Sequence, residues 1–246
     1  SQVRGHTPDS IGVAFRTSTL EGLPYHPPTQ GKWCYDKNED GTLDQHMECV
    51  GGYENALSFG EKFQSMVDSQ FKYLLMNWNP MGHPPPHVYQ HPHFDVHFYV
   101  TPNSERLAIR PGPCSVLVHC DDHEKGKKPL ESRYVPKDYS FTEAIEPGMG
   151  NHMMDFTGPE FNGEKFTHSF IYGHYDGEMT FYEPMVTLEY FKNVASGDVA
   201  SRCFAMKLPQ AWETSGWYPT KYCIRYRANR DEVTTSLEDF VYRKAA

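Results

Sequence analysis

The chain has 246 residues, with 23 basic and 32 acidic side chains and a formal net charge of −9 at pH 7. This acidic balance argues against nucleic acid and anionic membrane surfaces as partners, because both recruit basic patches. The sequence has no apolar run of about 18 residues, so we expect no membrane span.

Composition predicts an all-β fold. The chain holds 16 Tyr, 15 Phe, 19 Gly and 19 Pro, which is typical of many short strands joined by Gly/Pro turns. No linker or repeat divides the sequence, and β-barrels and sandwiches of this size often form one domain. We therefore predict a single domain over residues 1–246, a β-barrel or sandwich of the cupin or lipocalin kind with one short helix.

The predicted elements begin with a strand at Ser10–Arg16. Residues Leu57–Val67 carry apolar side chains at helical spacing and are the one helical candidate. A strand at Phe71–Asn79 follows, and the prolines of Gly82–His87 exclude regular structure there. Asp176-Gly177 predicts a type I′ hairpin. Further strands are predicted at Arg106–Arg110, Ser115–Cys120, Phe166–Tyr175, Met179–Tyr190, Arg202–Leu208 and Tyr222–Arg227.

Six cysteines fall into three closely spaced pairs, which suits disulfides in an oxidising compartment, although spacing alone does not establish their connectivity. The first residues are not a signal peptide, so the chain is either cytosolic or a mature product whose signal has been removed. The cysteines favour secretion or a periplasmic location. The pairs are Cys34/Cys49, Cys114/Cys120 and Cys203/Cys223.

Asp36-Lys-Asn-Glu-Asp-Gly41 matches the first half of a calcium loop. Its twelfth position is Met47, where such a loop needs a bidentate Glu, although Glu48 is adjacent. Hairpin turns also favour Asn, Asp and Gly, so we interpret this segment as a turn clamped by Cys34 and Cys49.

The stretch from His91 to Val100 carries opposite chemistry on alternating residues. In a strand, residues i, i+2 and i+4 share a face, so His91, His93, Asp95, His97 and Tyr99 point one way and apolar residues point the other. Imidazole and carboxylate are common ligands of transition metals. We therefore predict a metal site on this strand, with His93 and His97 preferred because Pro92 can turn His91 aside.

Three residues elsewhere could complete the site. Glu183 shares parity with Met179, Phe181 and Met185, and a carboxylate on an apolar face is costly unless it is paired or bound to a metal. The glycines before His152 could deliver it into a cavity from a loop. Histidines also lie on the predicted Phe166–Tyr175 strand, where we rank His174 above His168 and both below His152.

These residues favour a metal-dependent enzyme that acts on a small molecule, the ion being zinc, iron, copper, nickel or manganese. Tyr99 or Asp95 would serve as acid, base or support for the ligands. One alternative is a secreted binding or structural protein with a structural ion. Another is a metal-free histidine network that responds to pH or forms a homo-oligomer interface.

Several sequence blocks resemble an uncharacterised, mostly bacterial family of secreted β-rich proteins. The resemblance implies one exported all-β domain with His93, His97, His152 and Glu183 as its shared polar set, and it implies no activity. This chain departs from the pattern at His87 and Met153 and carries more cysteines. The His-x-His-x3-His spacing also resembles the first cupin metal motif, without the Glu that follows it in cupins. The matching blocks include Asn77–Pro80, Gly82–Pro86, Pro92–Tyr99, Met149–His152, Glu183–Thr187 and Gly216–Thr220.

Overall fold

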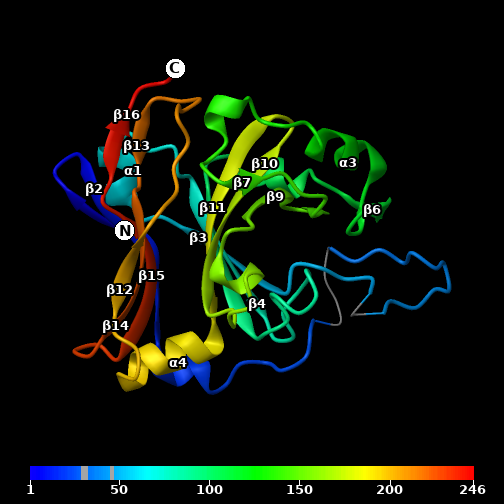
Figure 1. Ribbon diagram of the computed structural model, residues 1–246, viewed down its shortest axis with the longest axis horizontal. Coiled ribbons are helices and arrows are strands. Elements are labelled where there is room, and N and C mark those ends of the chain that lie inside the picture. The colour runs from blue at the N-terminus through cyan, green and yellow to red at the C-terminus, as the bar shows by residue number, and fades with distance from the viewer. Residues whose placement is uncertain (29–32, 45–46) are drawn as a thin grey trace.

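The computed structural model describes residues 1–28, 33–44 and 47–246, and most of its strands belong to two antiparallel sheets (Figure 1). The smaller sheet has the order β1 (Gln2–Arg4), β2 (Thr7–Arg16), β15 (Glu232–Glu238), β14 (Lys221–Arg227) and β12 (Arg202–Ala205). The larger sheet has the order β3 (Tyr53–Ser58), β4 (Tyr73–Asn79), β5 (His93–Tyr99), β11 (Glu178–Thr187), β10 (His168–Tyr175), β9 (Gly150–Asp155) and β7 (Tyr139–Ser140), and β8 (Ile145–Glu146) also pairs with β9.

The remaining elements are short. In the described ranges there are four helices, α1 (Glu61–Met66), α2 (Asn103–Leu107), α3 (Cys120–Gly126) and α4 (Leu188–Ser196). A third, two-stranded sheet pairs β13 (Gly216–Tyr218) with β16 (Val241–Arg243), and β6 (Pro111–Cys114) stands near α3. Three single turns of 3₁₀ helix lie at Thr17–Leu20, Ser132–Tyr134 and Pro159–Phe161.

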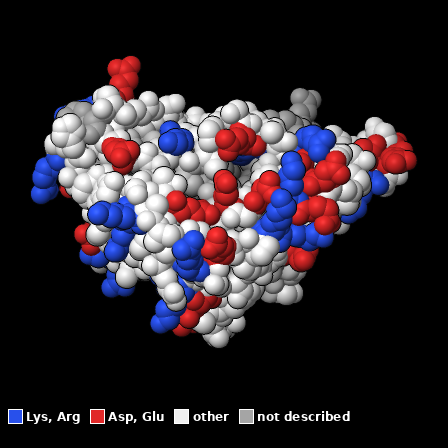
Figure 2. Space-filling model, turned by 90° about the horizontal axis from the view of Figure 1, so that it is seen from above, with Lys and Arg blue, Asp and Glu red and all other residues white. Residues whose placement is uncertain are grey.

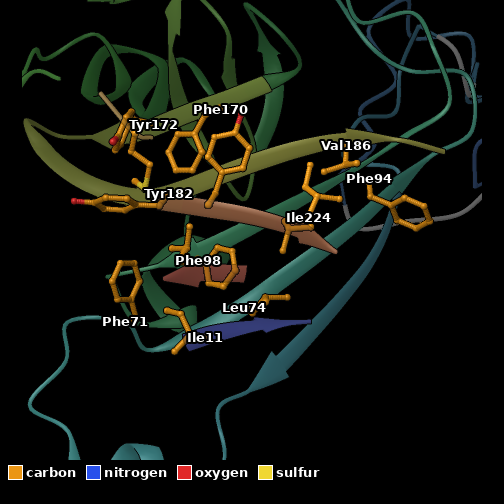
Figure 3. Packing of buried hydrophobic residues seen from close by; sticks show 14 of the residues in the cluster. Ile11, Phe71, Leu74, Phe94, Phe98, Phe170, Tyr172, Tyr182, Val186 and Ile224 are labelled. Carbon is orange, nitrogen blue, oxygen red and sulfur yellow. The ribbon is translucent and has the colours of Figure 1, made fainter. Parts of the chain in front are cut away.

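The two sheets face one another and enclose the main hydrophobic core. Apolar side chains of β4, β5, β10 and β11 meet those of β2, β14 and β15 there, as Figure 3 shows for part of the cluster. Alternation explains the arrangement, since Phe94, Val96 and Phe98 of β5 all enter this core. Sheet-on-sheet packing of this kind is a sandwich.

The larger sheet is buried on its second face as well. There Tyr73, Leu75, Tyr99, Phe181 and Met185 form a second apolar cluster with side chains from the loops. In Figure 1 these loops, together with α3 and β6, lie on the side of the larger sheet away from the smaller one. Because both faces are covered, polar side chains on the second face are removed from water.

The structure confirms the all-β prediction and selects the sandwich. β3 and β7 end the path of the larger sheet without pairing to each other in the described residues, so the sheet does not close into a barrel. The predicted helix at Leu57–Val67 is present over Glu61–Met66 as α1, whereas Leu57 and Ser58 belong to β3, and the described residues contain three further short helices. One of them, α4, follows β11 directly, so the predicted strand Met179–Tyr190 is wrong beyond Thr187, whose side chain caps the helix by accepting from the Tyr190 amide.

Two predicted strands are absent. Residues Arg106–Arg110 include the end of α2, where the buried Arg106 guanidinium donates to Glu54 and to the Gly148 carbonyl. Residues Ser115–Cys120 form a turn between β6 and α3, with Ser115 and Leu117 at positive φ. In both segments, long-range polar contacts and turn geometry override the local strand pattern.

The hairpin between β10 and β11 is confirmed, with Asp176 and Gly177 both at positive φ, as a type I′ turn requires. The register of this pair shifts between Gly173 and His174. Met179 consequently packs with the main core, whereas Phe181 lies on the second face. The prediction that Met179 and Glu183 lie on the same face of the strand is therefore wrong, because the bulge inserts one residue between them.

All six cysteines form disulfides, in the pairs Cys34–Cys49, Cys114–Cys120 and Cys203–Cys223. The first clamps the Asp36–Gly41 segment, where Asp36 accepts from the Gly41 amide and Asp40 from the Thr42 amide. A backbone amide thus takes one oxygen of each carboxylate, which supports the turn interpretation. No helix in the described ranges is long and apolar enough to span a bilayer.

Candidate metal centre

Two groups of potential metal ligands lie on the second face of the larger sheet. The first, which we call the inner triad, comprises His97, His152 and Glu183, with one ligand atom from each all within 4.8 Å of one another. The second, the outer triad, comprises His83, His93 and Asp95 and meets the same spacing. Both triads use β5, whose alternation places His93, Asp95 and His97 on this face.

The inner triad draws its residues from three strands. His97 comes from β5, Glu183 from its neighbour β11, and His152 from β9, two strands beyond β11. Gly173 of β10 stands between His152 and Phe181 in the register. A Cβ on Gly173 would come within 2.1 Å of the Phe181 ring, so a residue with a side chain at this position would displace the ring.

Phe181 is the packing centre of the inner triad. Its ring lies edge-on to His97 at 4.8 Å and edge-on to His152 at 5.3 Å, measured between centroids. Both imidazoles therefore pack against one fully buried ring, and this packing restricts their rotation.

Hydrogen bonds orient the nitrogens of the inner triad. The His152 Nδ1 is 2.8 Å from the Ala144 carbonyl, and a carbonyl only accepts, so Nδ1 donates to it and Nε2 is the ring nitrogen that remains for another partner. His97 Nε2 lies 3.3 Å from Glu183 Oε1, and neither this nitrogen nor Glu183 Oε2 has a hydrogen-bond partner among the described residues.

Burial determines the charge states in the inner triad. Burial lowers the pKa of His97 to about 3, with further contributions from nearby charges, so this ring is neutral near pH 7. Burial, reinforced by the charges of Asp95 and Glu146, raises the pKa of Glu183 well above its usual range. Without a cation the site is therefore a costly place for a carboxylate.

The outer triad is built around Asp95. Its Oδ1 lies 3.1 Å from His93 Nε2, its Oδ2 lies 3.6 Å from His83 Nε2, and Asn79 Nδ2 donates to Oδ2 at 2.5 Å. Burial would raise the pKa of Asp95, but the two histidines outweigh it and hold the pKa well below its usual range. Burial likewise opposes protonation of His83, yet its contact with Asp95 raises the pKa of this ring to about 9.

A pocket of about 450 Å³ reaches both triads. Its lining includes His83 and Asp95 of the outer triad and His152 and Glu183 of the inner triad, along with apolar side chains such as Met154 and Ile171. A small molecule could therefore contact both groups from one side.

The predicted residues divide among these groups. The structure brings His97, His152 and Glu183 together and places His93 with Asp95. His152 was expected on a loop, and that expectation is wrong, because β9 carries it and its pairing with β10 directs it to the second face.

The other predicted residues lie outside both triads. His91 contributes its carbonyl, which accepts from His93 Nδ1 at 2.6 Å. His174 is buried with its ring against Phe141. Tyr99 stacks on Tyr73 and donates to the Gly148 carbonyl at 3.5 Å, and burial raises its pKa well above the usual range, so its hydroxyl keeps its proton.

His83 is the residue that sequence reasoning missed. It lies just before the proline run, and the Pro84 carbonyl is 2.7 Å from its Nδ1. Its position in a stiff proline segment just before the histidine strand could have marked it as a candidate. The direction in which that segment folds depends on distant contacts and cannot be predicted from neighbouring residues.

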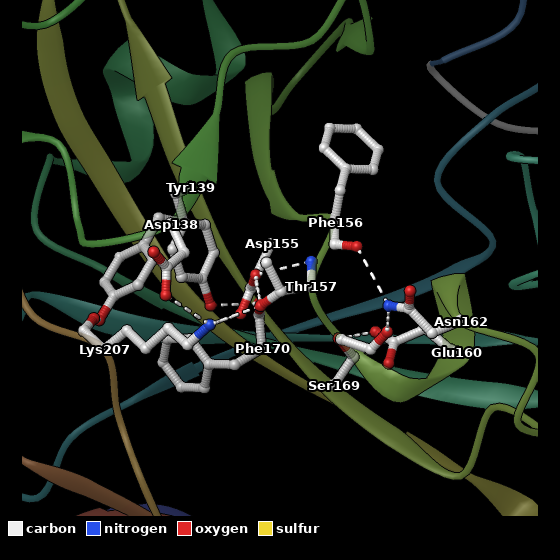
Figure 4. Close-up of polar contacts among 12 residues, drawn as sticks. Asp138, Tyr139, Asp155, Phe156, Thr157, Glu160, Asn162, Ser169, Phe170 and Lys207 are labelled. Carbon is white, nitrogen blue, oxygen red and sulfur yellow. Dashed lines mark hydrogen bonds and ion pairs between the residues drawn. The ribbon is translucent and has the colours of Figure 1, made fainter.

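Two polar clusters outside the triads have partners within the fold. In Figure 4, Lys207 Nζ contacts Asp138, Asp155 and Thr157 at 2.5–2.9 Å. In the same view the buried Glu160 accepts from Ser169. On the face shown in Figure 2, basic and acidic side chains are intermingled without a continuous basic patch.

No family model, curated protein or solved structure matches this chain. Function must therefore be inferred from the side chains and their geometry.

Proposed function

We propose that the chain binds a divalent transition-metal ion through His97, His152 and Glu183 and acts as a metal-dependent enzyme on a small molecule that enters the adjoining pocket. The observation that carries the proposal is a set of buried acceptor atoms that face each other. His97 Nε2 and Glu183 Oε1 are 3.3 Å apart, and one ring nitrogen of His152 completes the group.

The spacing supports coordination. Two ligands bound at about 2.0–2.1 Å to a tetrahedral ion are roughly 3.3–3.4 Å apart. Two lone pairs facing at that distance repel unless a proton or a metal lies between them. Burial disfavours a proton on His97 and raises the pKa of Glu183, so a metal ion would displace a proton of the Glu183 carboxyl and bind the neutral ring.

The surroundings support a held ligand set. The Nδ1 of His152 is occupied by the Ala144 carbonyl, which is the arrangement that fixes the tautomer of a metal-binding histidine. Two imidazoles and one carboxylate form the ligand set of several catalytic zinc sites, in which water or substrate takes the remaining position. The pocket beside His152 and Glu183 supplies room for that fourth ligand.

The chemistry that such an ion would supply is general. It would polarise a bound carbonyl or lower the pKa of a bound water. Mixed nitrogen and oxygen ligation suits zinc, iron, copper, nickel or manganese better than calcium or magnesium.

A non-catalytic structural ion is the second candidate. Full burial of His97 and its packing on Phe181 favour it, because structural sites are closed. The two functions differ in one measurable property, since a catalytic ion keeps an exchangeable water and a structural ion does not.

The test is elemental analysis of protein purified without a polyhistidine tag, beside His97→Gln and His152→Gln. We expect bound transition metal in the wild type and loss of one equivalent in each variant, with unchanged folding by circular dichroism. His87→Asn is the matched control, because His87 is solvent-exposed and its φ of 66° suits asparagine. Full metal content in both triad variants would refute the site.

Enzyme and structural protein are separated by cobalt substitution. Visible absorption that shifts on addition of azide or cyanide indicates an open position and supports catalysis. A spectrum that these anions leave unchanged, together with a lower melting temperature after chelation, would favour the structural role.

A further inference from the structure

We infer that a second divalent ion binds at the outer triad of His83, His93 and Asp95, which would make the site a two-ion centre. This inference goes beyond the proposed function, because its three ligands are different residues and its test does not require the inner triad to bind.

The ring nitrogens of the outer triad are held for coordination. The His93 Nδ1 is 2.6 Å from the His91 carbonyl, and the His83 Nδ1 is 2.7 Å from the Pro84 carbonyl. Each Nδ1 therefore carries its proton and donates it to the backbone. Both Nε2 atoms are left toward the Asp95 carboxylate, at 3.1 and 3.6 Å.

The contact between His93 and Asp95 is unsatisfied as it stands. Within the described chain, His93 Nε2 and Asp95 Oδ1 are both buried without a hydrogen-bond partner, although they are 3.1 Å apart. Two acceptor atoms at this distance repel, so either a proton or a metal ion lies between them. The separation is close to the ligand–ligand distance of a tetrahedral or octahedral ion with bonds of about 2.0–2.1 Å.

Neighbouring side chains hold these ligands in place. Asn79 pairs with His93 in the β4–β5 register, and its Nδ2 donates to Asp95 Oδ2 at 2.5 Å. The ring of His93 lies edge-on to His83 at 4.6 Å and to Phe166 at 5.4 Å. Hydrogen-bonded carboxylates and restrained imidazoles are the usual surroundings of a metal ligand.

The outer triad is the more accessible of the two. The side chain of His83 is 27% exposed, whereas those of His97 and Glu183 are at most 2% exposed. His83 and Asp95 line the pocket beside His152 and Glu183, and the charge of Asp95 acts on both His97 and Glu183. An ion in the outer triad would therefore meet solvent and substrate, and would share its electrostatic surroundings with the inner ion.

The strongest competing account is a protonated pair, in which a proton on His83 or His93 neutralises Asp95. Such a pair satisfies the same contacts without an ion. Stoichiometry distinguishes the two accounts, because a protonated pair binds no metal.

The experiment titrates chelator-treated protein with Zn²⁺ and Co²⁺ by calorimetry and measures bound metal after desalting. We expect two ions per chain in the wild type, one in the His83→Gln/His93→Gln double variant, and two in the His87→Asn control. The side chain of His83 is partly exposed, so its position tolerates a polar replacement. His83→Gln alone should lower the affinity for one of the two ions by at least about 10-fold.

Each other outcome has a definite meaning. One ion per chain that is unaffected by His83→Gln and His93→Gln but lost in His97→Gln would overturn the outer site and leave the inner one. One ion lost only in the His83 and His93 variants would support the outer site and refute the inner one. No bound Zn²⁺ or Co²⁺ in the wild type would overturn both and favour the protonated pair.

Discussion

Replacement of Gly173 by alanine should disrupt the inner triad without touching a ligand. A Cβ at this position would stand 2.1–2.3 Å from three atoms of the Phe181 ring, and ordinary contact begins near 3.4 Å. The ring would have to move by more than 1 Å. It is fully buried against His97, Tyr99 and His152, so the space for that movement is occupied.

Overpacking of this kind costs about 1–3 kcal/mol. At roughly 2–4 °C per kcal/mol for a chain of this size, Gly173→Ala should lower the melting temperature of the metal-free protein by about 2–12 °C. Because the displaced ring supports both imidazoles, Zn²⁺ affinity should fall as well. The measurements are a thermal melt and a Zn²⁺ titration.

The control is Gly22→Ala, where a Cβ meets nothing within 4 Å and φ is not positive. That substitution should be neutral, or stabilising by up to about 1 kcal/mol. If Gly173→Ala melts with the wild type and binds Zn²⁺ equally well, then Phe181 does not hold the triad in the way described.

Three further predictions concern single side chains. Glu183→Gln removes a buried carboxylate, so the free energy of unfolding of the metal-free protein at pH 8 should be unchanged or higher. The variant should lose the stabilisation by Zn²⁺, which in the wild type would be about 2.7 kcal/mol at an ion concentration 100 times Kd. Equal Zn²⁺-induced shifts of the melting temperature in the two proteins would contradict this. Asn79→Ala should weaken one bound ion by about 10- to 100-fold by freeing Asp95, measured by calorimetry. Burial, aided by the Arg202 charge, lowers the pKa of His168 to about 4, so the folded state resists protonation and this stability is lost as pH falls from 6.5 towards 4. Urea unfolding should therefore show a loss from pH 7 to pH 5 that is about 1–2 kcal/mol smaller in His168→Gln than in the wild type.

The shared face of His93, Asp95 and His97 on β5 could be predicted because the information for it is local. Strict alternation over His93–Tyr99 sorts the side chains into two faces, and the structure buries one face in the main core and the other beneath the loops. The same reasoning located Glu183 correctly, although it took Met179 for a neighbour. A bulge at Gly173/His174 breaks the parity between them, and no local pattern announces it.

The rest of the site depends on pairing between distant segments. His152 reaches the inner triad because β9 pairs with β10 and because Gly173 leaves space for Phe181 between them. His83 reaches Asp95 because its loop folds back over β5. Neither of these long-range contacts produces a periodic pattern in the sequence. His152 was therefore expected on a loop, and His83 was not considered as a ligand.

The second face of the larger sheet gathers carboxylates and imidazoles in one buried region. Asp95, Glu183 and Glu146 adjoin the same pocket, and three of the four histidines beside them hold their Nδ1 protons on backbone carbonyls. The Nε2 atoms of His83, His93 and His97 then face carboxylate oxygens at 3.1–3.6 Å, where a proton or a metal ion can bridge each pair. A fold that needed these positions only for packing would be more stable with apolar side chains there, since unpaired buried polar groups cost free energy. Bound cations would pair these buried groups and remove that cost, and the free energy gained would contribute to metal affinity. This is the physical reason for expecting metal at both triads.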